Sequence, residues 1–281
     1  MAKCEESDLI WHFTGADNLY PILKDGILAT HQAFMNDRSD CSLCRRVTMA
    51  TAKILECALD TPRHELPEEY IEMISGLSIG TWHSIYLVCF SAVVDNPLLW
   101  RCYTSQGGFA IGVSKDQVRA NLDISRSQLS AVRFQDCSYN DWCDVVHKVD
   151  EFESAIMHQC ARLKDPICDA RERAEIQAKV IMESLEMERE LAFHKDPFFE
   201  GENEVRLAYT YQKPLPISDL LFLGGKPRIR THLSTPFSSL VKRILVSPFG
   251  DKEENLKLAQ LLAASIGLSV ANVGMYEAPV R

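Results

Sequence analysis

The stretch Phe198-Phe199-Glu200-Gly201-Glu202-Asn203-Glu204-Val205-Arg206-Leu207-Ala208-Tyr209-Thr210-Tyr211 alternates between charged and apolar residues in its second half. A strand places alternate side chains on opposite faces, so Glu202, Glu204 and Arg206 are predicted to share one face. Like charges two residues apart repel, so a cation, a ligand or solvent must hold the carboxylates there. The alternative is an exposed edge strand whose Glu–Arg pair contributes little. Five aromatic residues between Phe193 and Tyr211 favour a half-buried site.

Length and composition predict one domain over residues 1–281, with a helical insertion at about 142–192. With 46% apolar residues the chain can bury a substantial core. It contains no run of about 18 apolar residues and no secretory leader, so we expect a soluble, cytoplasmic protein that does not bind membranes. We therefore expect the ten cysteines to be reduced. The spacing of Cys137, Cys143 and His147 fits no familiar zinc template, so no metal site is predicted.

The net charge of −9 means that the surface as a whole repels nucleic acid. A polyanion would have to meet the one obvious basic concentration, which comprises Lys226, Arg228, Arg230, His232, Lys242 and Arg243. The alternative for most of these residues is a solvated basic face.

Hydrophobic periodicity predicts an α+β or mixed α/β protein in which helices separate short strands. Strands are expected at 9–14, 85–91, 107–113, 202–211, 220–223, 244–247 and 269–273. Helices are expected at about 17–24, at 47–59, 67–74 and 253–266, and as a pair within 142–192, and a polar loop is expected at 31–40.

Four segments together resemble a large bacterial family of unassigned function, whose pattern runs His-(Tyr/Phe)-Thr, Met-Asn-Asp-Pro-x-Glu, Phe-Ser, Leu-Trp-x-x-Tyr and Phe-x-x-Glu-x-Glu-x-Arg. The resemblance is nearly end to end. This chain matches with His12-Phe13-Thr14, Met35-Asn36-Asp37, Phe90-Ser91, Leu99-Trp100-x-x-Tyr103 and Phe199-x-x-Glu202-x-Glu204-x-Arg206. It departs at Arg38, Asp40 and Asp196, where the family has Pro, Glu and His.

The order His12, Phe90-Ser91, Glu204 also resembles, more distantly, the ADP-ribosyltransferase fold. That resemblance implies an α+β fold built on a split, mixed β-sheet with flanking helices. It implies that NAD is a consumed substrate and that no cofactor is permanently bound. The chain has neither Gly-x-Gly-x-x-Gly nor a P-loop, the motifs of other nucleotide-binding folds.

The same resemblance implies a role for each candidate residue. Glu204 would stabilise the oxocarbenium-like ribose, Glu202 would orient the acceptor, and Arg206 would hold the two apart or contact pyrophosphate. His12 and Thr14 would bind ribose hydroxyls, and the backbone at Phe13, where many relatives have Gly, would meet the nicotinamide amide. Stacking candidates are Tyr86, Phe90, Trp100 and Tyr103, and Ser91, Asn36 and Asp37 complete the expected binding set.

The resemblance implies a toxin or phage-defence effector, compatible with an antitoxin or immunity partner. The acceptor would be nucleic acid, bound through the basic residues from Lys226 to Arg243, or water. Two other classes stay open. One is a binding module for a nucleotide or nucleic-acid end, without turnover. The other is a metal-dependent nuclease or hydrolase that uses Glu202, Glu204, Asp37 and Asp40 as ligands.

Overall fold

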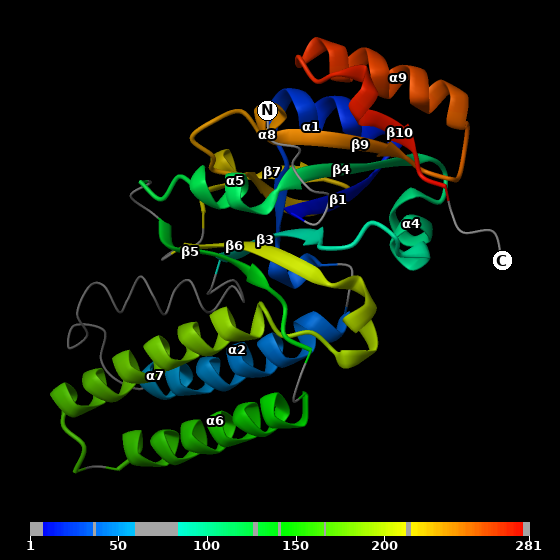
Figure 1. Cartoon of the computed structure of the whole chain (residues 1–281). Coiled ribbons are helices and arrows are strands. Elements are labelled where there is room, and N and C mark those ends of the chain that lie inside the picture. Colours follow the sequence, from blue (N-terminus) through cyan, green and yellow to red (C-terminus); the bar gives the residue numbers. More distant parts are fainter. Residues whose placement is uncertain are drawn as a thin grey trace.

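The computed structural model describes residues 8–35, 38–59, 84–125, 129–139, 142–165, 167–211 and 215–277. Helices cover both sides of a mixed β-sheet, so the expected α+β class is confirmed (Figure 1). The strands are β1 (Leu9–Gly15), β2 (Leu28–His31), β3 (Ser84–Ser91), β4 (Gly108–Ser114), β5 (Leu129–Asp136), β6 (Glu204–Tyr211), β7 (Leu221–Leu223), β8 (Lys226–Arg230), β9 (Val241–Val246) and β10 (Val273–Met275). The helices are α1 (Leu19–Asp25), α2 (Arg38–Leu59), α4 (Pro97–Thr104), α5 (Lys115–Ala120), α6 (Trp142–Leu163), α7 (Ala170–Leu191), α8 (Phe237–Leu240) and α9 (Lys252–Ser265).

The sheet has the order β10-β9-β4-β1-β3-β2-β8-β7, and β6 and β5 branch from β3. β9 and β10 are parallel, whereas the other pairs are antiparallel. β1 follows β4 along its whole length, but its pairing with β3 is a single residue pair, Trp11 with Ser91. β3 instead follows β6 from Ser84 to Ser91. The two halves of the sheet therefore separate between β1 and β3.

The main core lies on the face of the sheet that packs against α1, α8 and α9. A smaller cluster on β1, β4 and α4 includes Trp11, Phe13 and Trp100. Together these clusters bury both faces of β1, because successive side chains of a strand point to opposite sides. Only His12 and Gly15 of that strand are partly exposed.

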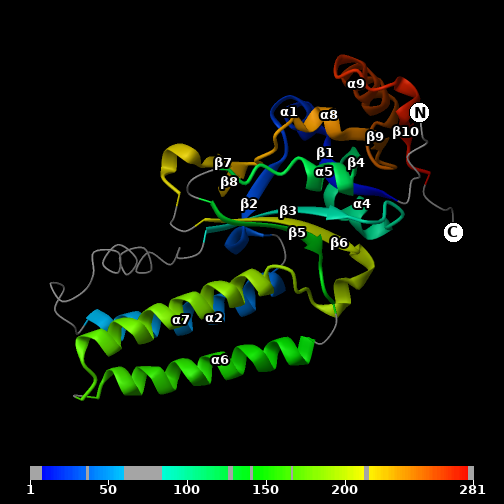
Figure 2. The same cartoon turned by 60° about the vertical axis from the view of Figure 1, so that its left-hand side comes forward.

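α2, α6 and α7 form a helical layer with its own apolar core, on the side of β3, β5 and β6 (Figure 2). α6 and α7 confirm the two helices expected within 142–192. α2 joins them from another part of the chain, because its buried residues Leu43, Val47 and Ile54 recur at helical spacing. Within the described ranges no helix combines the length and apolar character needed to cross a bilayer.

Several expectations were wrong. The loop expected at 31–40 contains the end of β2, a 3-10 helix (Gln32–Phe34) and the start of α2. The strand expected at 269–273 is a 3-10 helix (Val270–Asn272) followed by β10. β5 and β8 were not expected, since their polar residues and Pro227 argue against strands. The helix expected at 67–74 lies outside the described residues.

Candidate functional site

A cleft of about 600 Å³ opens where β1 and β3 separate. β1 contributes His12 and Thr14 to it, and β3 contributes Cys89. The acidic stretch before and at the start of β6 adds Glu202 and Glu204. Further polar residues line the cleft, among them Ser91 of β3, Tyr103, Lys195, Lys226, Arg228 and Arg230. The structure thus brings His12 and both predicted carboxylates to one cavity.

His12 is held in one tautomer by a backbone hydrogen bond. Its Nδ1 lies 3.0 Å from the carbonyl oxygen of Cys89 on β3. A carbonyl only accepts, so Nδ1 carries the proton and Nε2 keeps a lone pair. Burial, and then the nearby charge of Arg228, lower the pKa of His12 and outweigh the effect of the carbonyl. His12 is therefore a neutral hydrogen-bond acceptor at pH 7.

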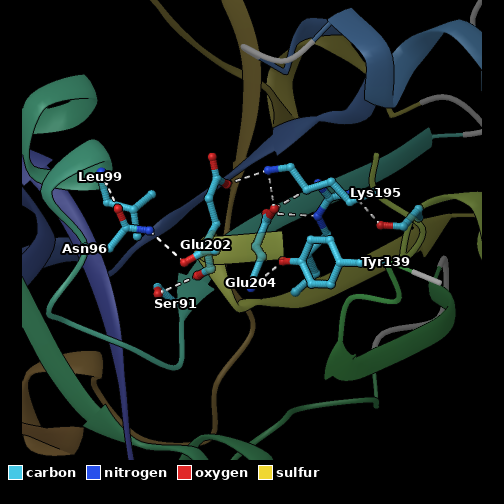
Figure 3. Close-up of polar contacts among 10 residues, drawn as sticks. Ser91, Asn96, Leu99, Tyr139, Lys195, Glu202 and Glu204 are labelled. Carbon is cyan, nitrogen blue, oxygen red and sulfur yellow. Dashed lines mark hydrogen bonds and ion pairs between the residues drawn. The ribbon is translucent and has the colours of Figure 1, made fainter. Parts of the chain in front are cut away.

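Glu202 and Glu204 are bridged by Lys195, which comes from the turn after α7 (Figure 3). Lys195 Nζ lies 2.5 Å from Glu202 Oε2 and 2.8 Å from Glu204 Oε2. Arg206 binds the same Glu204 carboxylate with two nitrogens, Nε at 2.9 Å from Oε1 and Nη2 at 3.1 Å from Oε2. Of the cation, ligand or solvent expected to hold the two carboxylates together, the structure shows a cation, the Lys195 side chain.

Three hydrogen bonds from Lys195 and Arg206 occupy the Glu204 carboxylate. The nearby thiol of Cys89, whose own pKa burial raises, further lowers the pKa of this carboxyl group. A carboxylate offers about four acceptor sites, so these hydrogen bonds leave little capacity for a ligand. Burial alone would raise the pKa of Glu204, but Arg206 and then Lys195 outweigh it and lower that pKa to about 2. Glu204 is therefore ionised throughout the physiological range.

Glu202 keeps acceptor capacity. Among the described residues, Lys195 is the one that donates a hydrogen bond to Glu202. The side chain of Glu202 is 13% exposed, whereas that of Glu204 is 6% exposed. Counted together, two carboxylates and two cations make the cluster electrically neutral. Of the two acids, Glu202 is the one with room for a ligand hydroxyl or amide.

The prediction that Glu202 lies on the strand is wrong. β6 begins at Glu204, and Glu202 ends a 3-10 helix (Pro197–Glu202). Between them Asn203 has φ +42°, in the left-handed region, and this kink turns the chain before β6 begins. The alternation from Glu204 onward is confirmed, because Val205 and Leu207 enter the main core on the other face.

Short polar contacts fix the turn that carries Glu202. Asp196 caps the 3-10 helix by accepting from the backbone N–H of Phe198 at 2.9 Å. Asn96 donates to the carbonyl of Gly201 at 2.7 Å, and Ser91 Oγ lies 2.7 Å from the carbonyl oxygen of Glu202 (Figure 3). Ser91 lines the cleft, but its hydroxyl is used in holding this turn.

The aromatic candidates divide into two groups. Tyr103 is 41% exposed at the cleft, and Phe90 and Phe13 line it as buried side chains. Tyr86 and Trp100 do not reach the cleft, so their expected stacking role is wrong. Tyr86 packs edge-on against Tyr211 in the core, and Trp100 is fully buried and donates to the carbonyl of Val94.

Arg206 is also outside the cleft. It is 1% exposed and donates to Glu204 and to the carbonyl of Ala192 at 2.7 Å. Of the two roles expected for Arg206, contact with pyrophosphate is therefore wrong in this arrangement. Asn36 and Asp37 lie outside the described residues.

The basic residues do not form one patch. Lys226, Arg228 and Arg230 on β8 line the cleft, but Lys242 and Arg243 lie on β9, with β4, β1, β3 and β2 in between. The expectation that the whole basic stretch from Lys226 to Arg243 would line one site is therefore wrong. His232 is buried beside the Tyr211 hydroxyl and is not part of a basic surface.

A resident metal has little support at the carboxylates. Lys195 and Arg206 already neutralise them, and in the described part of the chain no three His, Cys, Asp or Glu residues are grouped to hold a metal ion. Asp37 falls outside that part. The hydrolase alternative would have to displace a lysine and an arginine from Glu204.

The sequence did not predict an individual role in the cleft for three residues, which are Lys195, Cys89 and Arg228. Lys195 lies only nine residues before Glu204, but the helical turn between them gives no periodic signal. Cys89 sits in an apolar run typical of a buried strand. Arg228 was noted only as a member of a basic stretch.

Comparisons of this chain with protein-family models, with curated proteins and with solved structures give no match.

Proposed function

We propose that this protein binds NAD in the cleft between β1 and β3 and cleaves the bond between nicotinamide and ribose, as an ADP-ribosyltransferase-like enzyme that passes ADP-ribose to an acceptor or to water. The observation that supports this most is that His12 and the Glu202–Glu204 pair, distant in sequence, line one cleft. A toxin or phage-defence effector is the cellular role that the resemblance to the ADP-ribosyltransferase fold suggests.

The chemistry calls for a hydroxyl acceptor and a carboxylate on opposite sides of the ribose. Neutral His12, with its Nε2 lone pair, suits the first role because it can accept a ribose hydroxyl. As the C–N bond breaks, positive charge builds on the ribose, and a fixed carboxylate stabilises that charge. Tyr103, exposed at the cleft, is the aromatic candidate from the sequence that is available to stack on the nicotinamide ring, and the exposed Phe34 and Phe222 also line the cleft.

We assign the substrate-facing carboxylate to Glu202, where the family resemblance implied Glu204. Glu204 already accepts three hydrogen bonds from Lys195 and Arg206, and these two cations neutralise it. Glu202 has one lysine contact and greater exposure. In this assignment Glu204 and Lys195 are positioning residues that hold Glu202 at the cleft.

A second candidate, the non-catalytic nucleotide-binding module, is favoured by one observation. Because the four-charge cluster is neutral, it stabilises a developing cation less than a free carboxylate pair would. A module of this kind would bind the dinucleotide and release nothing.

The deciding experiment is to incubate the purified chain with NAD and measure free nicotinamide by chromatography. We expect release by the wild type and a loss of at least about 100-fold in kcat for Glu202→Gln, with the dissociation constant for NAD changed less than about threefold. Glu200→Gln is the matched control, an exposed glutamate of the same 3-10 helix, and should behave as wild type. NAD binding without nicotinamide release would establish the module instead.

A further inference from the structure

Arg228 is a cation in the wall of the cleft, and no hydrogen bond of its side chain is found among the residues that the structure describes. It lies at the centre of β8, which pairs with β2 on one side and β7 on the other. Alternation along β8 places Lys226, Arg228 and Arg230 toward the cleft, whereas Ile229 enters the main core. The strand thus holds Arg228 at a fixed position in the cavity wall.

The Nε atom of Arg228 is buried and has no hydrogen-bond partner within the described ranges. Buried polar atoms are rarely left in this state, because an unsatisfied donor loses its hydrogen bonds to water without replacing them. The other cations of the cleft differ. Lys195 binds two carboxylates, and Arg230 donates to the carbonyl of Asp25 at 3.0 Å and lies 3.7 Å from its carboxylate.

The positive charge of Arg228 helps to lower the pKa of His12, which lines the same cleft. No carboxylate of the described residues pairs with Arg228. Glu202 and Glu204 are both engaged by Lys195, and Asp25 is engaged by Arg230. Among the described residues, the carboxylates of the cleft are therefore engaged elsewhere, and none is left to neutralise Arg228.

We propose that Arg228 binds a phosphate group of the ligand, so that the cleft selects a nucleoside diphosphate or a dinucleotide built on one. A planar guanidinium with several N–H groups matches two phosphate oxygens at once. Bound there, the phosphate would satisfy the donors of Arg228. This inference rests on one part of the proposed function, that the cleft binds NAD. It does not require that the protein cleaves NAD.

A small nucleotide suits this wall better than a nucleic-acid strand. A strand needs several uncommitted cations in a row, since its affinity comes from successive phosphates. On β8 the next cation toward α1, Arg230, is already paired with Asp25. A cavity of about 600 Å³ is within the range of sites for single small ligands.

The test is calorimetric titration of the full chain with ADP, with adenosine as the ligand that lacks phosphate. We expect ADP to bind at least about tenfold more tightly than adenosine, and Arg228→Gln to weaken ADP at least about tenfold while leaving adenosine unchanged. Arg228→Lys should recover only part of the loss, because an ammonium group cannot form the two-pronged contact. Arg230→Gln is the matched control and should weaken ADP less than about threefold.

Three results would overturn the inference: equal affinities for ADP and adenosine, wild-type affinity of Arg228→Gln for ADP, or equal effects at Arg228 and Arg230. Arg228 is only partly buried, so the folding of Arg228→Gln, checked by thermal melting, should be close to that of the wild type. The inference and the proposed catalysis fail separately. ADP binding that depends on Arg228 without release of nicotinamide from NAD would refute only the catalysis. Release of nicotinamide with an unchanged KM in Arg228→Gln would refute only the phosphate contact.

Discussion

Lys195 Nζ lies 2.8 Å from Glu204 Oε2, and both residues are only 5% exposed. Burial of charges costs several kcal/mol for each ion unless partners compensate, so the two groups depend on each other. Lys195 also reaches Glu202, and Arg206 braces Glu204 from the other side. The geometry of the cleft therefore depends on a compact set of four charges, not on a single acid.

Lys195→Met should destabilise the fold. The substitution keeps the apolar stem but leaves Glu202 without its donor and Glu204 with Arg206 alone, so we expect a loss of about 3 kcal/mol in the free energy of unfolding. Urea denaturation at pH 7 measures it. Lys115→Met, which breaks the more exposed pair with Asp136, should cost less than about 1 kcal/mol. Equal losses in the two variants would contradict the role given to Lys195.

Glu204 should stay ionised in acid. Its pKa in the folded protein is lowered to about 2 from an ordinary value of 4.5, so its contribution is complete above 4.5 and is lost as the pH falls toward 2. Carbon NMR of the carboxyl group should show no protonation between pH 7 and 3.5. A midpoint for Glu204 above 4 would refute the arrangement.

Glu188 in the helical layer should give the opposite pH dependence. Burial raises its pKa to about 8, outweighing the hydrogen bond from Thr48. A raised acid pKa means that the folded state holds the proton more tightly, so stability falls as the pH rises from 4.5 to 8, by about 1.4 kcal/mol per unit. Because of Glu188, the free energy of unfolding should be about 3 kcal/mol lower at pH 7.5 than at pH 5.5.

The difference between these two pH values should shrink by that amount in Glu188→Gln. The amide can still accept from Thr48, and it does not ionise in the unfolded chain. Glu183→Gln, an exposed substitution on the same helix, should leave the difference unchanged. An unaltered pH dependence in Glu188→Gln would show that Glu188 is not protonated in the folded protein.

Asn203 should tolerate glycine but not a β-branched residue. Asn and Gly adopt the left-handed φ of +42° at little cost, whereas Val in this conformation would lower the free energy of unfolding by about 1–2 kcal/mol more. We expect Asn203→Gly to unfold within about 0.5 kcal/mol of the wild type and Asn203→Val to be less stable. If the proposed function holds, Asn203→Val should also lower nicotinamide release, because the turn sets the position of Glu202. Equal stability of the two variants would exclude this turn geometry.

The strands that line the cleft could largely be predicted because their signals are local. Apolar alternation at β1 and the apolar run at β3 fix both strands within a residue or two. β8 escaped prediction because a segment with three cations and Pro227 lacks strand character, and it forms through pairing with β2 and β7. The contact of Lys195 with Glu204 depends on the turn after α7, which no period in the sequence specifies. Tertiary burial likewise decided that Trp100 packs in the core while Tyr103 stays exposed.

The end of α7 is tied directly to the charges of the cleft. Arg206 donates to the carbonyl of Ala192, the residue that ends the helix, and Lys195 follows three residues later. A helix of 22 residues is a rigid rod about 33 Å long. Sliding or tilting that rod would shift Lys195 against Glu204. A molecule that binds to the far end of the helical layer and moves α7 would thus change the contact between Lys195 and Glu204 without entering the cleft.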